Sequence, residues 1–182
     1  QSTEHHQKPK IKIGHLNIRS LKNRDHLLQL RILVRDNDFD IFSVSETWLK
    51  SIEIAGYKLQ DKIGQESGGG VCVYTKASLK VKVLKDPSSV STTGFHQLWL
   101  QIQRKRMKSI LLCATYKPTD VEQQVSRMTL AYLHESGKDV FILGDLNCNL
   151  LKKCPEVNAL NDLCATLNLK QLVTSPTRVT EH

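Results

Sequence analysis

The sequence lacks any run of about 18 apolar residues, so it predicts no membrane-spanning helix. Residues 1–10 are polar and lack the apolar core of a signal peptide. The five cysteines are odd in number, include no Cys-x-x-Cys pair and form no convincing zinc motif with the histidines. We therefore expect an intracellular protein that is not secreted, with residues 1–10 as a polar tail and no membrane among its partners.

Acidic residues are scarce relative to basic ones. The chain has 26 lysines and arginines against 18 aspartates and glutamates, which gives a net charge of +8 and a pI of about 9.3. This excess favours a polyanionic partner, because lysine and arginine release condensed counterions from phosphates. Each short basic run taken alone is more typical of a solvated face, as at Arg104–Arg106 and Lys152–Lys153. The length of 182 residues suits one domain.

The first part of the chain has the pattern of a parallel crossover. A strand over residues 11–18 ends near Asn17, Asn23 is a candidate helix N-cap, and residues 36–38 break the helix. A second buried strand follows at residues 41–46. Parallel strands bring their carboxyl ends to one edge of a sheet, so Asn17 and Glu46 should lie close together.

The later part reads as short strands with two more helices. Residues 98–102 and 109–116 should form a hairpin, and Val140–Leu143 should be a buried strand. The other expected elements are strands at 71–74, 80–84 and 169–173 and helices around 121–132 and 160–167. Mixed strands with segregated helices favour an α/β sandwich of two sheets with helices outside.

Polar residues follow four of the apolar strands, at residues 16–19, 45–47, 114–118 and 144–147. One polar strand end is ordinary, but four of them with two acids indicate a shared set of hard oxygen ligands suited to Mg²⁺. The glycines at 68–70 lack the features of a phosphate-binding loop, so a tight turn or a close backbone approach is expected there. Trp48 and Trp99 are expected to be packing residues, with base stacking as an alternative for Trp48.

Six sequence motifs of the chain resemble those of the endonuclease/exonuclease/phosphatase superfamily, and their residues resemble most those of the endonuclease of LINE-type (non-LTR) retrotransposons. In order, they are His15-Leu16-Asn17-Ile18-Arg19-Ser20-Leu21, Ser45-Glu46-Thr47-Trp48-Leu49, Gly68-Gly69-Gly70-Val71, Tyr116-Lys117-Pro118, Gly144-Asp145-Leu146-Asn147 and Thr174-Ser175-Pro176-Thr177-Arg178. The resemblance covers residues 11–182. It implies a four-layer α/β sandwich like that of DNase I, with two packed mixed sheets flanked by helices.

The resemblance also implies hydrolysis of a phosphodiester with Mg²⁺, or Mn²⁺ in its place, nicking DNA so that a reverse transcriptase can prime from the cut. Glu46 would hold the metal with support from Asn17, and Asp145 would orient or deprotonate the attacking water. Asn147 and Tyr116 would hold the phosphate. The residues implied for contact with DNA are Arg19, Lys117 and Trp48. A reverse transcriptase domain in the full natural protein and action in the nucleus are implied as well.

The resemblance further implies catalytic residues that the chain does not contain. An Asp on a strand and a Ser-Asp-His segment should follow the Thr-Ser-Pro-Thr region, so residues 11–182 are expected to be a domain whose C-terminal part is missing. Two alternatives therefore stay open. One is an inactive remnant that at most binds nucleic acid through its charge, and the other is a phosphoesterase of the same superfamily that acts on a small phosphoester.

Overall fold

A computed structural model describes residues 10–19, 23–47, 52–65, 68–91, 94–103, 107–118 and 136–177. Its first elements are the predicted crossover, formed by β1 (Ile13–Asn17), α1 (Arg24–Asn37) and β2 (Ile41–Ser45). The Asn23 side chain caps α1 by accepting a hydrogen bond from the Asp25 N–H at 2.9 Å. Asp38 ends the helix in the left-handed conformation, with φ of 49°. β1 and β2 pair in parallel, which places Asn17 opposite Ser45 at one sheet edge.

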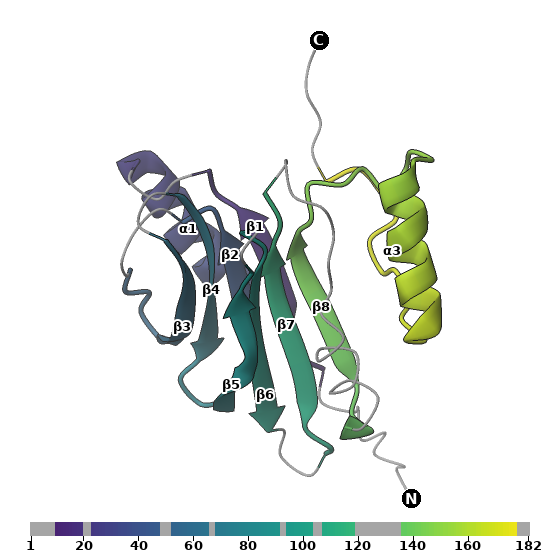
Figure 1. Ribbon diagram of the computed structural model, residues 1–182. Coiled ribbons are helices and arrows are strands. Elements are labelled where there is room, and N and C mark those ends of the chain that lie inside the picture. Colours follow the sequence, from purple (N-terminus) through teal and green to yellow (C-terminus); the bar gives the residue numbers. More distant parts are fainter. Residues whose placement is uncertain are drawn as a thin grey trace, which may run out of the picture.

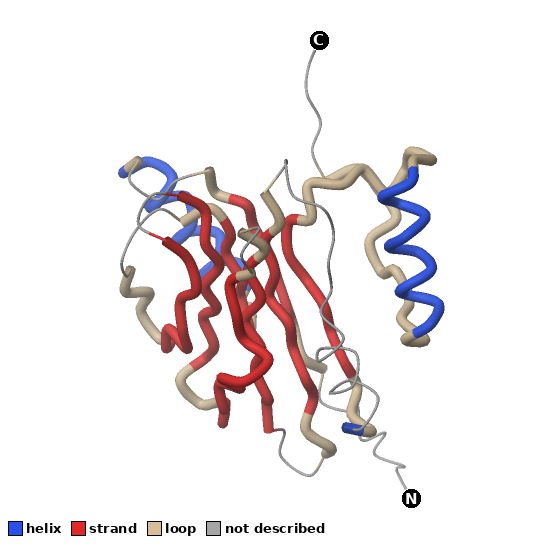
Figure 2. The backbone as a smooth tube through the Cα atoms, viewed as in Figure 1, coloured by secondary structure: helices blue, strands red, loops and turns tan. Residues whose placement is uncertain are grey.

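The crossover belongs to a four-stranded sheet, called sheet A here, with strand order β1-β2-β4-β3. β3 (Tyr57–Gln65) and β4 (Gly68–Lys76) run antiparallel to each other, and β4 runs antiparallel to β2. Helix α1 covers one face of sheet A (Figures 1 and 2). That layer is held by buried apolar side chains from the helix and the sheet, namely Leu30, Val34, Phe42, Val44, Cys72 and Tyr74.

The second sheet, sheet B, has strand order β5-β6-β7-β8. Its strands are β5 (Lys80–Val90), β6 (His96–Gln103), β7 (Ile110–Tyr116) and β8 (Val140–Asp145). β6 and β7 form the predicted antiparallel hairpin pair, and β8 joins β7 in parallel. The inner faces of the two sheets share one core, which contains Ile41, Val71 and Val73 of sheet A and Leu98, Leu100, Ile102, Ile110, Leu112 and Ala114 of sheet B. The packing matches a face-to-face sandwich.

Helix α3 (Pro155–Thr166) lies on the far side of sheet B from sheet A, so the layers follow the order α1, sheet A, sheet B, α3 (Figure 1). Leu167, which follows α3, packs with Trp99 and Cys113 on the outer face of sheet B. Trp99 is only 1% exposed, so it is the packing residue that its sequence context predicted. The predicted four-layer α/β sandwich of two mixed sheets is confirmed.

Two expectations from the sequence are wrong. Val140–Leu143 is not a buried strand, because β8 lies at the end of sheet B and Ile142 on it is 42% exposed. Residues 169–173 form no strand, and Leu172 and Val173 are exposed. A β-rich sequence becomes a strand only beside a partner that accepts its hydrogen bonds, and the described residues supply none for this segment. The helix expected at 121–132 and the residues Trp48 and Arg104–Arg106 lie outside the described residues.

Candidate active site

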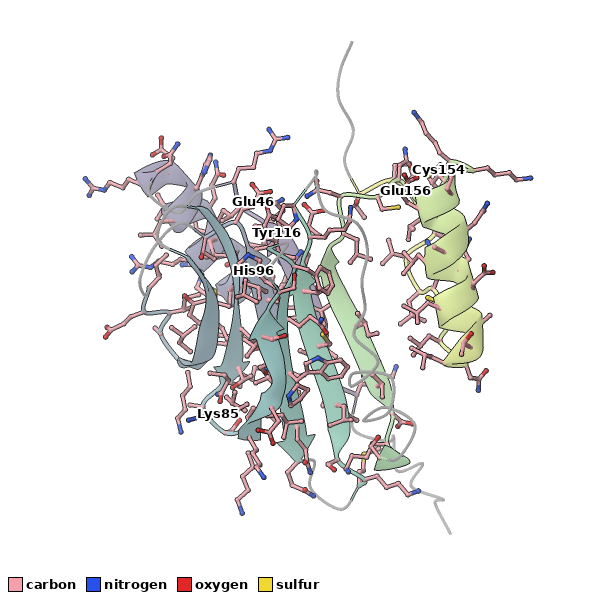
Figure 3. The ribbon with its side chains drawn as sticks, in the orientation of Figure 1. Glu46, Lys85, His96, Tyr116, Cys154 and Glu156 are labelled. Carbon is pink, nitrogen blue, oxygen red and sulfur yellow. The ribbon has the colours of Figure 1, made fainter. Side chains whose placement is uncertain are left out.

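Four of the predicted site residues meet where strands of both sheets end. Asn17 ends β1 and Glu46 follows β2 in sheet A, while Tyr116 ends β7 and Asp145 ends β8 in sheet B. Tyr116 and Asp145 are paired in the register of the parallel strands β7 and β8. Figure 3 shows Glu46 and Tyr116 together at one end of the two sheets, with Lys85 at the opposite end. The site is therefore built from strand ends, as the sequence predicted.

A single amide group joins the two carboxylates. The Nδ2 of Asn17 donates to Oε1 of Glu46 at 2.8 Å and to Oδ2 of Asp145 at 2.5 Å. The amide oxygen of Asn17 in turn accepts a hydrogen bond from the Arg19 N–H at 3.0 Å. Asn17 thereby fixes two acidic side chains from different sheets beside one nitrogen. Charge-assisted hydrogen bonds of this kind are stronger than neutral ones, so the spacing of the carboxylates is well defined.

The backbone turns sharply after three of the strands. Arg19, Glu46 and Asn147 all have left-handed φ angles, of 52°, 55° and 46°. Such angles cost non-glycine residues roughly 1 kcal/mol or more, and strained residues cluster at functional sites. The Glu46 turn is held in place by a hydrogen bond from its own N–H to the carbonyl oxygen of Gly70 at 2.9 Å.

Gly144 allows the strand before Asp145 to lie close to β7. A Cβ atom at position 144 would come within 1.8 Å of the carbonyl oxygen of Thr115. The φ angle of Gly144 is 154°. Only glycine fits this contact without a shift of one strand. The glycine of the Gly-Asp-Leu-Asn motif is thus explained by the packing that places Asp145.

Further hydrogen bonds fix Asp145 from its own loop. Its Oδ1 accepts from the Asn147 N–H at 2.8 Å, and its carbonyl oxygen accepts from the Lys117 N–H at 2.9 Å. Asn147 also donates from Nδ2 to the carbonyl oxygen of Lys117 at 2.6 Å. Lys117 is buried, whereas Arg19 and Asn147 are exposed. Contacts of Lys117 and Arg19 with DNA remain predictions, and Trp48 lies outside the described residues.

Tyr116 provides a phenol next to the acidic pair. Burial raises the pKa of Tyr116, and the negative charges of Glu46 and Asp145 and a hydrogen bond to Glu46 raise it further. The phenol therefore keeps its proton at neutral pH and can donate it in a hydrogen bond to an oxygen anion.

Sequence reasoning missed a polar group that lies between the sheets beneath the site. His15 is on the same face of β1 as Asn17, with Nδ1 3.3 Å from Oγ of Ser43 and Nε2 3.5 Å from Oγ of Ser45. Both serines are fully buried. Burial lowers the pKa of His15 to about 4, against an opposing effect of Asp145, so the ring is neutral at pH 7. The alternation of side chains along β1 is the signal that links His15 to the Asn17 face.

The donor set fits a hard divalent cation. Glu46 and Asp145 converge on one nitrogen, and among the residues that the structure describes neither carboxylate has a lysine or arginine partner. The described ranges also hold no cluster of three or more His, Cys, Asp or Glu side chains. A cation here would be completed by amide oxygens, water and substrate. Mg²⁺ binds in this manner, through one or two carboxylates and several waters or phosphate oxygens.

Comparison with known proteins identifies the family. The profile described as "Endonuclease/Exonuclease/phosphatase family" matches residues 14–152, which include all four converging residues. The chain belongs to the endonuclease/exonuclease/phosphatase family. Members of this family are in general hydrolytic nucleases and phosphatases and typically use divalent metals. No curated protein sequence matches the chain.

Solved structures of the endonuclease/exonuclease/phosphatase fold resemble the chain over most of its length. The endonuclease domain of TRAS1, a telomere-specific non-LTR retrotransposon, is 15% identical with a TM-score of 0.68, covering 87% of this chain and 73% of that one. The AP endonuclease LMAP from Leishmania major is 16% identical with a TM-score of 0.65, covering 87% and 67%. A mannosyl-6-phosphatase from Bacteroides thetaiotaomicron is 14% identical with a TM-score of 0.58, covering 85% and 71%. At these identities the likeness establishes the fold.

Within the described ranges, no helix is long and apolar enough to span a membrane.

Proposed function

We propose that this family member is a divalent-cation-dependent endonuclease domain of a LINE-type retrotransposon, which nicks DNA to prime reverse transcription. The observation that carries the proposal is the convergence of Glu46 and Asp145 on the amide of Asn17, with the Tyr116 phenol beside them. Hydrolysis of a phosphodiester needs a charge-neutralising cation, a fixed group that aligns water and donors for the phosphate oxygens. These strand ends supply residues that would hold such a cation, a fixed carboxylate and a phenol donor.

Each side chain has a role that follows from its contacts. Glu46 and Asn17 would hold Mg²⁺ or Mn²⁺, and the bound cation would neutralise charge on the phosphate. N–H donors of Asn17 and Asn147 fix both oxygens of Asp145, so this carboxylate is held in place to orient the attacking water, and it takes up the proton of that water. Tyr116 donates its phenol proton in a hydrogen bond to a phosphate oxygen. Asn147, exposed beside it, holds the same phosphate.

The net charge of the chain and the residues of its sequence motifs favour DNA as the substrate. The net charge of +8 favours a nucleic acid over a small phosphoester. Arg19 is exposed next to Asn17 and would contact a backbone phosphate, with Trp48 as a further contact, whereas Lys117 is buried beside the site. The likeness to the TRAS1 endonuclease domain supports a retrotransposon origin. Such a domain would act in the nucleus and would be followed by a reverse transcriptase in the full natural protein.

A nicking assay tests the proposal. Supercoiled plasmid incubated with the chain and millimolar Mg²⁺ should become nicked circles, with Mn²⁺ as a substitute and EDTA abolishing the product. Glu46→Gln and Asp145→Asn should each lower the rate by at least about 100-fold. The matched controls, Glu53→Gln and Asp86→Asn, change exposed acids outside the site and should stay within about twofold of the unaltered chain.

The outcomes separate the alternatives. Binding that weakens steeply with salt, ignores Mg²⁺ and is accompanied by no nicking would identify a non-catalytic remnant. The likeness to a mannosyl-6-phosphatase motivates the other alternative. Mg²⁺-dependent phosphate release from small phosphoesters, without plasmid nicking, would assign the site to such substrates instead.

A further inference from the structure

The ring of Tyr116 is enclosed by residues from both sheets. His96, the cross-strand partner of Tyr116 on β6, lies with its ring centroid 5.6 Å from the Tyr116 centroid and an interplanar angle of 51°. Gly69 of β4 approaches the same ring from sheet A, and a Cβ atom there would lie 2.7 Å from Cε1 of Tyr116 and 3.7 Å from Nε2 of His96. Figure 3 shows Glu46, Tyr116 and His96 grouped at one end of the sheets.

His96 itself is held firmly. The residue is 4% exposed, and its carbonyl oxygen accepts a hydrogen bond from Oγ1 of buried Thr115 at 2.9 Å. Aromatic pairs with centroids 4.5–7 Å apart and tilted planes are favourable arrangements. His96 belongs to none of the sequence motifs and has no part in the hydrolysis described above. Its contact with Tyr116 gives it an indirect link to the site.

Gly69 completes the enclosure because its backbone can adopt a conformation that brings it against the ring. Its φ is +69°, a value that side chains disfavour. The sequence predicted a turn or a close approach at residues 68–70, and the structure adds the partner, which is the ring of Tyr116. Any side chain at position 69 would displace that ring or the strand.

We propose that His96 and Gly69 are positioning residues that hold the Tyr116 ring so that its hydroxyl meets Glu46 and the phosphate. This inference rests on the proposed function for its catalytic consequence. A tyrosine ring that is free to change rotamer must be ordered in every turnover, and small misplacements of a catalytic group reduce rate strongly. The enclosure provides that order in advance.

The first test is kinetic. His96→Ala should lower kcat for plasmid nicking by about 10-fold with KM changed by less than about twofold, whereas His96→Phe, which keeps a ring, should recover most of the rate. In a Tyr116→Phe background, His96→Ala should add less than about a twofold loss, because the hydroxyl to be positioned is gone. The proposal would be overturned if His96→Ala lowered kcat as strongly in the Tyr116→Phe background as in the unaltered chain, and if His96→Phe did not recover the rate.

The second test does not require activity. The chain has four tyrosines, so ring-labelled tyrosine NMR can follow the Tyr116 signals, assigned with Tyr116→Phe. His96→Ala should shift and average the Tyr116 ring resonances while those of Tyr57 and Tyr74 stay in place, and His96→Phe should restore slow ring motion. Unchanged Tyr116 signals in His96→Ala would overturn the positioning role even if the chain nicks DNA. If the chain does not nick DNA but these shifts occur, the proposed function fails and the positioning stands.

Glycine variants provide a matched pair for the same readout. Gly69→Ala and Gly56→Ala both place a side chain at positive φ, +69° and +81°, but a Cβ atom at position 56 meets nothing within 4 Å. Gly69→Ala should displace the Tyr116 signals and Gly56→Ala should not. Equal effects of the two variants would assign the change to backbone strain and contradict the contact with the ring.

Discussion

The two strands that lead into the acidic residues differ sharply in their surroundings. All five residues of β2, which precedes Glu46, are buried, and the strand lies between α1 and sheet B. β8, which ends at Asp145, is the terminal strand of sheet B and contains no fully buried residue. The position of Glu46 is thus fixed by the core. Asp145 depends on polar contacts at the end of its strand, with Asn17, Asn147 and the backbone of Lys117.

The two described helices show the same contrast. α1 begins with a side-chain cap from Asn23, whereas the N-cap residue of α3, Cys154, makes no side-chain cap hydrogen bond. Two residues of α1 are fully buried, but only Val157 is buried in α3. We conclude that one carboxylate rests on a well-packed region and the other on a more weakly packed one, and four experiments test this conclusion.

The largest effect is expected from truncating the core beneath β2. Phe42 is 1% exposed and packs beside Phe39 with ring centroids 5.1 Å apart. Phe42→Ala should lower the free energy of unfolding by about 3–5 kcal/mol. Ile142→Ala on β8 should cost less than about 1 kcal/mol, because Ile142 is 42% exposed. Urea unfolding measures the free energy of unfolding of both variants. Similar losses in the two would contradict the conclusion that β2 is better packed than β8.

Gly144→Ala should also have a large effect, because it forces β8 away from the Thr115 carbonyl. We expect a loss of roughly 2 kcal/mol or more, together with reduced nicking as Asp145 moves. Gly137→Ala is the control, since Gly137 also has positive φ but a Cβ atom there meets nothing within 4 Å. The melting temperature should fall clearly further in Gly144→Ala than in Gly137→Ala. An equal fall in the two variants would show that the close contact with Thr115 does not determine the stability lost at position 144.

The buried imidazole predicts a pH effect. His15 has a folded-state pKa of about 4 against 6.5 for the free side chain. As pH falls below 6.5 the unfolded chain binds a proton that the folded chain does not accept until near pH 4. Stability is therefore lost across that window, by about 3 kcal/mol. His15→Gln should flatten the dependence in urea unfolding at pH 7, 5.5 and 4 with EDTA present. An unchanged slope would exclude His15 as its source.

The smallest effects concern the helix caps. Asn23→Ala should cost about 1 kcal/mol, since the N–H of Asp25 loses its acceptor. Cys154→Ser should instead stabilise the chain by about 0.5 kcal/mol, because it supplies α3 with a cap. We expect the melting temperature to fall in Asn23→Ala and to rise in Cys154→Ser. A lower melting temperature in both variants would show that α3 is already well capped.

Much of the fold follows from local patterns in the sequence. Runs of β-branched residues predict β1 and β2, Asn23 predicts the start of α1, and the residues around Asp38 predict its end. Burial is harder to predict, because the run Val140–Leu143 has the same composition whether a strand lies on one side of it or on both. Residues 169–173 illustrate the same difficulty, since a strand depends on a partner that the local sequence does not specify.

The site could be predicted where it depends on strand ends, and it was missed where it depends on register. Asn17, Glu46, Tyr116 and Asp145 end strands or follow them directly, so parallel pairing brings Asn17 to Glu46 and Tyr116 to Asp145. The packing of the two sheets then brings the two pairs together. His96 is an isolated histidine at the start of β6. Only the pairing of β6 with β7 brings it beside Tyr116. The partner of Gly69 likewise comes from the packing of the two sheets, which no single segment encodes.

The hydrogen bonds of Asn17 join a strand end of sheet A to a strand end of sheet B. The proposed cation would bind beside this link, to Glu46 and Asn17, which follow or end separate strands and meet only in the folded chain. A ligand that binds only the folded state raises the unfolding free energy with the logarithm of its concentration. The melting temperature should thus rise with the Mg²⁺ concentration. The affinity for the cation can therefore be measured from thermal unfolding alone, with no DNA present.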